Sequence, residues 1–168
     1  GFGYVGSRLA KMAKGMDMEV YAYDPYISSE IMIQQGVTPL NKVEDIFTTG
    51  DYISLHIPAT AETKKSVNWN LLKLVKDNCI LVNTARKEVI DEDALIQALQ
   101  EKNKFRYVSD IAPDCSEKLM AEFAERVFWT PKKMGAQTEE ANTNAGVAAA
   151  RQIIAFFEKG DTTFQVNK

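Results

Sequence analysis

The sequence predicts an α/β fold with a doubly wound parallel sheet, and three observations carry this prediction. Segments of strand character alternate with segments of helix character along all 168 residues. Such alternation is typical of βαβ units, whose strands run parallel. A glycine-rich loop, GFGYVG, has the form G-x-G-x-x-G and leads into the first helix. An acidic residue ends the next strand, as in dinucleotide-binding folds.

Composition is that of a globular domain. Hydrophobic residues make up 45% and charged residues 26%, with a net charge of −3. Basic residues form no block, so we expect no nucleic-acid partner. Apolar runs fall far short of the roughly 20 residues of a membrane span, so we expect no membrane association. Cys79 and Cys115 lack metal-type spacing. We therefore expect no metal, two free thiols and a cytoplasmic protein.

Six segments are expected to be strands because they combine β-branched, aliphatic and aromatic residues. In chain order they are EVYAYD (19–24), VTPL (37–40), DYISLHIP (51–58), CILVNTAR (79–86), FRYVSDI (105–111) and RVFWT (126–130). The third must stop at Pro58, which cannot donate to a strand ladder. The fourth is apolar on both faces, as central parallel strands are.

Six helices are expected between and after these strands. They cover residues 4–16, 28–36, 43–48, 70–75, 91–101 and 138–159. The first carries Val5, Leu9, Met12 and Ala13 on one face. Gly36 and Gly160 end the second and the last. The helix at 91–101 has an acidic first turn, which the helix dipole favours.

Each glycine of GFGYVG has a distinct predicted role. Gly1 permits the tight turn, Gly3 lets the backbone approach a pyrophosphate, and Gly6 allows close packing of helix and sheet. The amides of Tyr4 and Val5 would then point at the phosphates from a helix N-terminus.

Asp24 is the acidic partner of this loop and lies 18 residues after Gly6. A carboxylate there can accept both ribose hydroxyls and would repel a 2′-phosphate. The sequence therefore favours NAD over NADP as the cofactor. The alternative is that Asp24 only forms a turn before Pro25.

Further segments extend the similarity to a known family. SLHIPATAETKKSVN, ILVNTARKEVIDEDALIQAL, SDI and TPKKMGAQTEEA follow the glycine loop and YDP in order. Together they resemble the NAD-binding domain of the D-isomer-specific 2-hydroxyacid dehydrogenases, over essentially the whole chain. The resemblance implies a Rossmann-type fold and an enzyme that transfers hydride between NAD(H) and a D-2-hydroxyacid/2-keto acid pair.

The resemblance also implies roles for individual residues. The expected cofactor-binding residues are Gly1, Gly3, Tyr4, Val5, Gly6, Asp24, Ile57, Thr63, Thr84, Ala85, Arg86 and Asp110. Arg86 would be catalytic as well, since the family uses this arginine to hold the substrate carboxylate and polarise the keto group. A planar guanidinium suits that role, because it pairs with a carboxylate through two hydrogen bonds. Alternatively, Arg86 forms a surface ion pair and Asp110 caps a turn.

The chain departs from the family at the acid–base. Lys132, in TPKKMG, stands where the family has a histidine, and Cys115 stands where the histidine's glutamate partner is expected. A glutamate fixes the tautomer of a catalytic histidine, and a lysine has no tautomer to fix. The lysine therefore explains the missing glutamate, and we expect Lys132 to be the second catalytic residue. His56, the chain's one histidine, would be a packed or cofactor-lining residue. If the chemistry were lost instead, the chain would be an NAD-binding sensor; a protein without nucleotide would leave GFGYVG and Asp24 unexplained.

The resemblance bears on domain organisation too. The family has a strand before GFGYVG and a second, substrate-binding domain, so we expect a fragment that lacks its first strand and most of that domain. Residues 1–160 would form the NAD-binding domain and residues 161–168 a return segment. The alanine-rich final helix is expected either in a homodimer interface or in the core.

Overall fold

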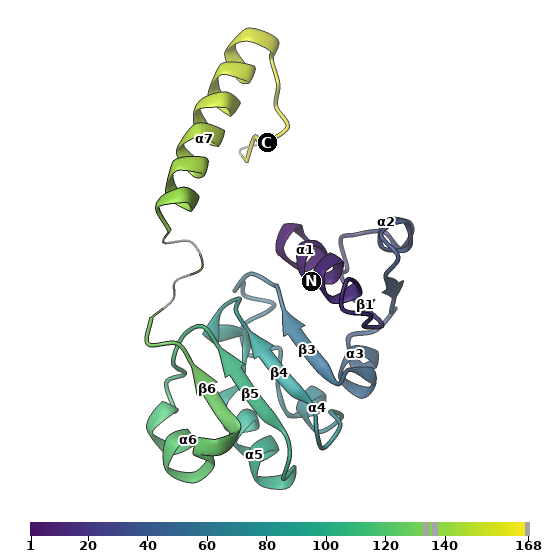
Figure 1. The fold of residues 1–168 in the computed structure, drawn as a ribbon, viewed down its shortest axis with the longest axis vertical. Coiled ribbons are helices and arrows are strands. Elements are labelled where there is room, and N and C mark those ends of the chain that lie inside the picture. Colours follow the sequence, from purple (N-terminus) through teal and green to yellow (C-terminus); the bar gives the residue numbers. More distant parts are fainter. Residues whose placement is uncertain (133–134, 136–137, 167–168) are drawn as a thin grey trace. The chain divides into compact units, whose positions relative to one another are not determined.

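The computed structural model describes residues 1–132, 135 and 138–166. It divides into two compact units, residues 1–131 and 132–168. Each unit is described by itself (Figure 1).

Strands and helices alternate along the described chain, as expected. The strands are β1 (Tyr21–Ala22), β2 (Thr38–Pro39), β3 (Tyr52–Leu55), β4 (Ile80–Asn83), β5 (Arg106–Ser109) and β6 (Val127–Trp129). The α-helices are α1 (Tyr4–Lys14), α2 (Ser29–Gln34), α3 (Val43–Thr49), α4 (Trp69–Leu72), α5 (Glu92–Glu101), α6 (Ser116–Phe123) and α7 (Glu139–Lys159). Two short 3₁₀ helices, η1 (Lys87–Val89) and η2 (Ala124–Arg126), complete the set.

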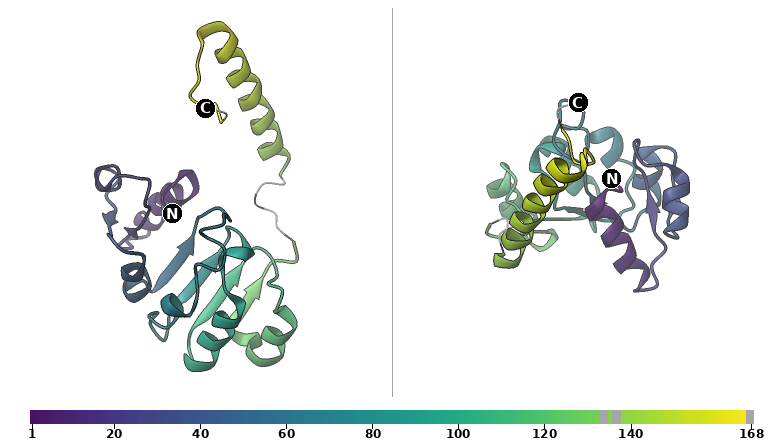
Figure 2. Two further views of the ribbon diagram at one scale, coloured as in Figure 1. Left: turned by 180° about the vertical axis from the view of Figure 1, so that it is seen from behind. Right: turned by 90° about the horizontal axis from the view of Figure 1, so that it is seen from above.

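All strand pairs are parallel, which confirms the predicted sheet type. Strands β3 to β6 form one sheet in sequence order, and they run side by side in the views of Figures 1 and 2. Strands β1 and β2 pair separately, through Tyr21↔Thr38 and Ala22↔Pro39. All the carboxyl ends of a parallel sheet lie at one edge, where ligands of open α/β folds bind.

The main core lies against one face of the four-stranded sheet. In register across it are Ile53, Leu81, Tyr107 and Val127, each at most 8% exposed. They join one apolar cluster with residues of α3 to α6. Side chains on the other face are half-buried or exposed, including Ile80 and Val82 of β4. The apolar second face of β4 is therefore less covered in this unit than its composition suggests.

A smaller core joins α1 and α2 to the β1–β2 pair. It consists of Phe2, Ala10, Ala22, Met32 and Val37. The expected apolar face of α1 does not enter it: Val5, Leu9 and Met12 are exposed, and the helix buries Gly6 and Ala10 instead. Small residues on the buried side bring the α1 backbone close to its neighbours.

Helix α6 was not expected from the sequence. Its Leu119 is fully buried and Phe123 is 9% exposed, so they anchor the helix to the main core. Topology offered a signal, because parallel strands such as β5 and β6 require a crossover connection, which is usually helical.

The second unit is built on α7. Thr138 caps its N-terminus by accepting a hydrogen bond from the amide of Ala141 (3.0 Å), and Gly160 ends it with φ +64°. Both features fit the expected boundaries of this helix. The proposed domain boundary at residue 160 stays a prediction, and the last two residues of the segment 161–168 lie outside the described residues. No described helix has the length and apolarity to cross a membrane.

Candidate active site

The glycine loop lies between the carboxyl ends of β1 and β3. The nitrogen of Gly1 donates to the carbonyl oxygen of Tyr23 (2.8 Å), just after β1. A Cβ built on Gly1 would lie 2.5 Å from the carbonyl oxygen of His56 and 3.2 Å from the side chain of Ile57. Only a glycine allows this approach to the chain after β3, and the tight turn expected at Gly1 stays a prediction.

Gly6 and Gly3 differ in what surrounds them. A Cβ on Gly6 would lie 2.2 Å from the carbonyl oxygen of Gly1, so the start of α1 is packed directly against the loop. A Cβ on Gly3 would meet nothing within 4 Å. The open space beside Gly3 fits a position where a ligand approaches the backbone.

The first turn of α1 fits a phosphate site. Gly3 is its N-cap and supplies no side-chain hydrogen bond to the helix amides. Tyr4 is 88% exposed and Val5 65%, so the first turn of the helix lies at the surface. Free amides and the helix dipole both favour an anion at such a terminus.

Asp24 ties the loop to the end of β1. One carboxylate oxygen accepts from the amide of Phe2 (2.7 Å), and the other accepts from the amide of Tyr26 (2.9 Å). The bond to Tyr26 forms the turn that the sequence analysis gave as the alternative role of Asp24. A carboxylate has about four acceptor positions, so capacity remains for ribose hydroxyls.

The segment after β3 carries three residues considered earlier. His56 is half-buried, its Nε2 lies 2.9 Å from the Ser54 hydroxyl, and burial lowers its pKa. Ile57 packs against the main core. Thr63 donates to the carbonyl oxygen of Pro58 (2.5 Å) and accepts from the amide of Thr60 (2.7 Å). Thr63 therefore shapes this loop, and its contact with a cofactor stays a prediction.

The loop after β4 is organised by Asn83, which sequence analysis missed. This side chain is 1% exposed. Its amide nitrogen donates to the carbonyl oxygen of Arg86 (2.9 Å), and its oxygen accepts from the amide of Ala85 (3.1 Å). The Arg86 side chain is exposed beyond it, with Nη1 donating to the Ala85 carbonyl (2.8 Å), and Thr84 is exposed as well. The signal available in the sequence was a polar Asn at the end of an apolar strand.

Asp110 joins the ends of three strands. Its amide donates to the carbonyl oxygen of Asn83 (3.3 Å), at the end of β4. Its own carbonyl oxygen accepts from the Thr130 hydroxyl (3.0 Å), after β6. Lys132 follows Thr130 by two residues, is exposed, and begins the second unit. The structure thus anchors the chain just before Lys132.

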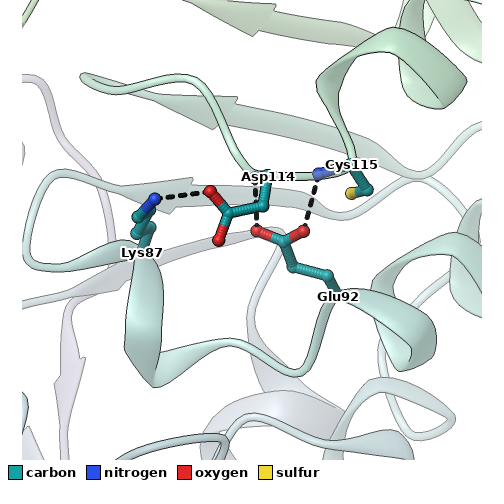
Figure 3. Close-up of polar contacts among 4 residues, drawn as sticks. All are labelled: Lys87, Glu92, Asp114 and Cys115. Atoms are coloured by element: carbon teal, nitrogen blue, oxygen red, sulfur yellow. Dashed lines mark hydrogen bonds and ion pairs between the residues drawn. The ribbon is translucent and has the colours of Figure 1, made fainter.

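Cys115, at the expected glutamate position, lies against Glu92 of α5 (Figure 3). Burial, together with the Glu92 carboxylate, raises the pKa of the Cys115 thiol to about 12. The carboxylate of Glu92 also accepts from the amides of Asp114 (2.8 Å) and Cys115 (2.7 Å). An acidic first turn was expected for α5, but its bonds to another loop were not.

The arrangement fits the predicted NAD site in part. Within residues 1–131, the glycine loop, Asp24, Ile57, the Thr84–Arg86 loop and Asp110 all follow carboxyl ends of parallel strands or lie against them. The open space at Gly3 and the exposed α1 terminus suit a pyrophosphate. Lys132 belongs to the other unit, so its place in the site stays a prediction.

Comparisons with known proteins give the family. Residues 1–132 match the model described as "D-isomer specific 2-hydroxyacid dehydrogenase, NAD binding domain". D-3-phosphoglycerate dehydrogenase of Methanocaldococcus jannaschii is 35% identical over 91% of this chain and 29% of its own length. The Escherichia coli K12 protein of the same name is 30% identical over 99% of this chain and 41% of its own length. The chain therefore spans less than half the length of these curated relatives.

Solved structures agree with the sequence comparisons. The NAD⁺-bound 3-phosphoglycerate dehydrogenase of Entamoeba histolytica has a TM-score of 0.86 and 44% identity, over 100% of this chain and 53% of that one. A D-lactate dehydrogenase from Aquifex aeolicus, complexed with NAD and lactic acid, has a TM-score of 0.74 and 28% identity, over 97% of this chain and 53% of that one.

Proposed function

We propose, because the chain belongs to the D-isomer specific 2-hydroxyacid dehydrogenases as their NAD-binding domain, that it is part of an NAD-dependent enzyme. The proposed reaction is the reversible reduction of a 2-keto acid to a D-2-hydroxyacid by NADH. The proposed pair is 3-phosphohydroxypyruvate and 3-phosphoglycerate, which would place the enzyme at the first step of serine biosynthesis. Similar proteins of three organisms bear the name 3-phosphoglycerate dehydrogenase, which supports this choice.

One observation carries the enzymatic proposal: an exposed arginine on a fixed backbone, in the same unit as the glycine loop and Asp24. The backbone of Arg86 is held by the buried side chain of Asn83. A sensor that only bound NAD would have no use for a carboxylate-binding arginine at the end of β4. Asp24 favours NAD over NADP, because its charge would repel a 2′-phosphate.

The chemistry assigned to the chain's own residues is limited. Bound NADH supplies the hydride. Arg86 holds the substrate carboxylate through two hydrogen bonds and polarises the keto group. Lys132, as an ammonium, donates a proton to the keto oxygen when the hydride is transferred, and takes it back in the oxidative direction.

We also propose that the protein is a cytoplasmic homodimer. Helix α7 supports a dimer contact, because Ile153, Ile154 and Phe157 are each more than half exposed within their own unit. Sedimentation equilibrium of the full-length protein would test the dimer. A monomer at micromolar concentration would argue against it.

The test of function compares the full-length protein with its Lys132→Ala variant. NADH oxidation is followed by absorbance with 3-phosphohydroxypyruvate as the oxidant, and NADH binding is measured separately by fluorescence. Turnover that collapses in the variant, with NADH binding retained, would support a dehydrogenase that uses lysine as its acid–base. A wild-type protein that binds NADH but reduces no 2-keto acid would instead be an NAD sensor.

A further inference from the structure

We propose that Lys87 and Asp114 are positioning residues that, together with Glu92, hold the Arg86 loop against the turn after β5 (Figure 3). The inference rests on the proposed function and deepens it, because it assigns residues that act on the substrate-binding arginine without touching substrate. The comparison with the family gave no role to these three residues.

The contact itself joins two loops that are distant in sequence. Lys87 follows Arg86 directly and begins η1. Its ammonium lies 2.5 Å from a carboxylate oxygen of Asp114, 27 residues further along the chain. Hydrogen bonding to Asp114 raises the pKa of Lys87, as expected for an ammonium group held by a carboxylate.

Glu92 fixes the other partner of this contact. Its two carboxylate oxygens accept separately from the amides of Asp114 (2.8 Å) and Cys115 (2.7 Å). Figure 3 shows this carboxylate under the turn, while the Asp114 side chain reaches toward Lys87. Charge-assisted bonds to two successive amides leave the turn little freedom, so Asp114 presents a preset anchor to Lys87.

The Arg86 backbone is thereby held from two sides. Asn83 binds its carbonyl oxygen from within the core, and Lys87, the next residue, is tied to the turn after β5. The Arg86 side chain is exposed and flexible by nature. A fixed backbone reduces the number of conformations open to the Arg86 side chain, so less conformational entropy is lost when the guanidinium binds substrate.

Stability is not a sufficient role for this ion pair. The side chains of Lys87 and Asp114 are 32% and 78% exposed, and exposed ion pairs contribute little to the free energy of unfolding. The chain offers a matched control at the opposite end of the sheet. Lys76 and Asp51 form an ion pair at 2.8 Å with side chains 41% and 63% exposed.

The experiment compares Lys87→Met, Asp114→Asn and the control Lys76→Met in the full-length protein. Measured quantities are kcat and KM for 3-phosphohydroxypyruvate, the Kd for NADH and the melting temperature. We expect Lys87→Met and Asp114→Asn each to lower kcat/KM about tenfold, because the arginine is misplaced. NADH affinity and melting temperature should stay at wild-type values, and Lys76→Met should behave as wild type throughout.

A second background tests whether Lys87 acts through Arg86. In an Arg86→Lys variant, adding Lys87→Met should cause no further loss, since the bidentate group it positions is already gone. An undiminished tenfold loss there would overturn the inference, as would unchanged kcat/KM in the single variants or an equal loss in Lys76→Met. A wild-type protein with NADH binding but no turnover would overturn the proposed function, and this inference with it.

Discussion

The two ends of the four-stranded sheet use polar side chains differently. At the carboxyl end, Asn83 binds backbone groups of the loop that follows it, and Glu92 accepts from two amides of the turn after β5. At the amino end, Asp51 and Lys76 bind each other's side chains. A bond to backbone fixes the course of a loop directly, whereas an ion pair between side chains does so only where its partner is itself held, as Glu92 holds Asp114. At the carboxyl end these bonds hold the backbone beside Arg86 and Asp114, as a site for a ligand requires.

The amino end also has a polar hollow of about 370 Å³. It is lined by Asn78, Asn103, Lys104, Arg106, Glu125 and Arg126. The guanidinium of Arg126 donates to the carbonyl oxygen of Lys102 (2.7 Å) and lies 5.0 Å from the centre of the Phe123 ring. These contacts join α6 and η2 to the loop after α5. Arg126 therefore has a structural role. Charged residues at this end of the sheet can serve as controls for variants at the carboxyl end.

The largest expected difference between the ends is between Arg86 and Arg106. Arg86→Ala should lower kcat/KM for the 2-keto acid about 10²- to 10³-fold, since it removes a preorganised donor to the reacting group. Arg106→Ala, at the first residue of β5, should leave it within about twofold of wild type. Steady-state kinetics of both variants would decide, and equal losses would place Arg86 outside the active site.

Asp24 and Asp51 give the next comparison. Asp24→Asn should weaken NADH binding about tenfold or more, because hydrogen bonds to a charged group contribute about 1.5–3 kcal/mol. Asp51→Asn should leave NADH binding unchanged, since it loses only the contact with Lys76. Fluorescence titration with NADH measures both. Unchanged affinity in Asp24→Asn would leave Asp24 as the turn residue that its bond to Tyr26 describes.

The two glycines separate packing from ligand approach within the carboxyl end. Gly6→Ala places a methyl group 2.2 Å from the carbonyl oxygen of Gly1, so it should destabilise the protein by about 1–3 kcal/mol. Gly3→Ala meets no neighbour, so it should leave the melting temperature unchanged while NADH binding weakens severalfold. Thermal unfolding and NADH titration together test the pair. A Gly3→Ala variant with wild-type affinity would contradict the pyrophosphate position.

The smallest expected effect concerns the thiols at the two ends. Glu92→Gln removes a negative charge beside Cys115, so the pKa of that thiol should fall from about 12. Each pKa unit lost raises the thiolate fraction about tenfold below the pKa, and alkylation at pH 8 should accelerate accordingly. Cys79 is fully buried at the amino end, and burial raises its pKa to about 12 as well. Mass spectrometry can follow both sites, and Cys79 should not change.

Periodicity located most elements of the fold, and its failures have physical causes. The strand segments and α5 were predicted because their apolar patterns are local. The prediction of which side of α1 is buried was wrong. The helix packs through the close backbone contact at Gly6, and Val5, Leu9 and Met12 are exposed. Helix α6 was missed, since its two buried residues are identifiable only once the core is known.

By itself, the sequence determined the parallel α/β architecture, the glycine loop with its acidic partner, and the family. These features depend on residue types at fixed spacing, which can be read along the sequence before the fold is known. Only the tertiary structure decided which side chains bind the backbone of segments distant in sequence. Asp24 binding the Phe2 amide and Glu92 binding the turn at Asp114 are examples. Hydrogen bonds require distances near 3 Å, and folding alone brings residues more than 20 positions apart to that separation.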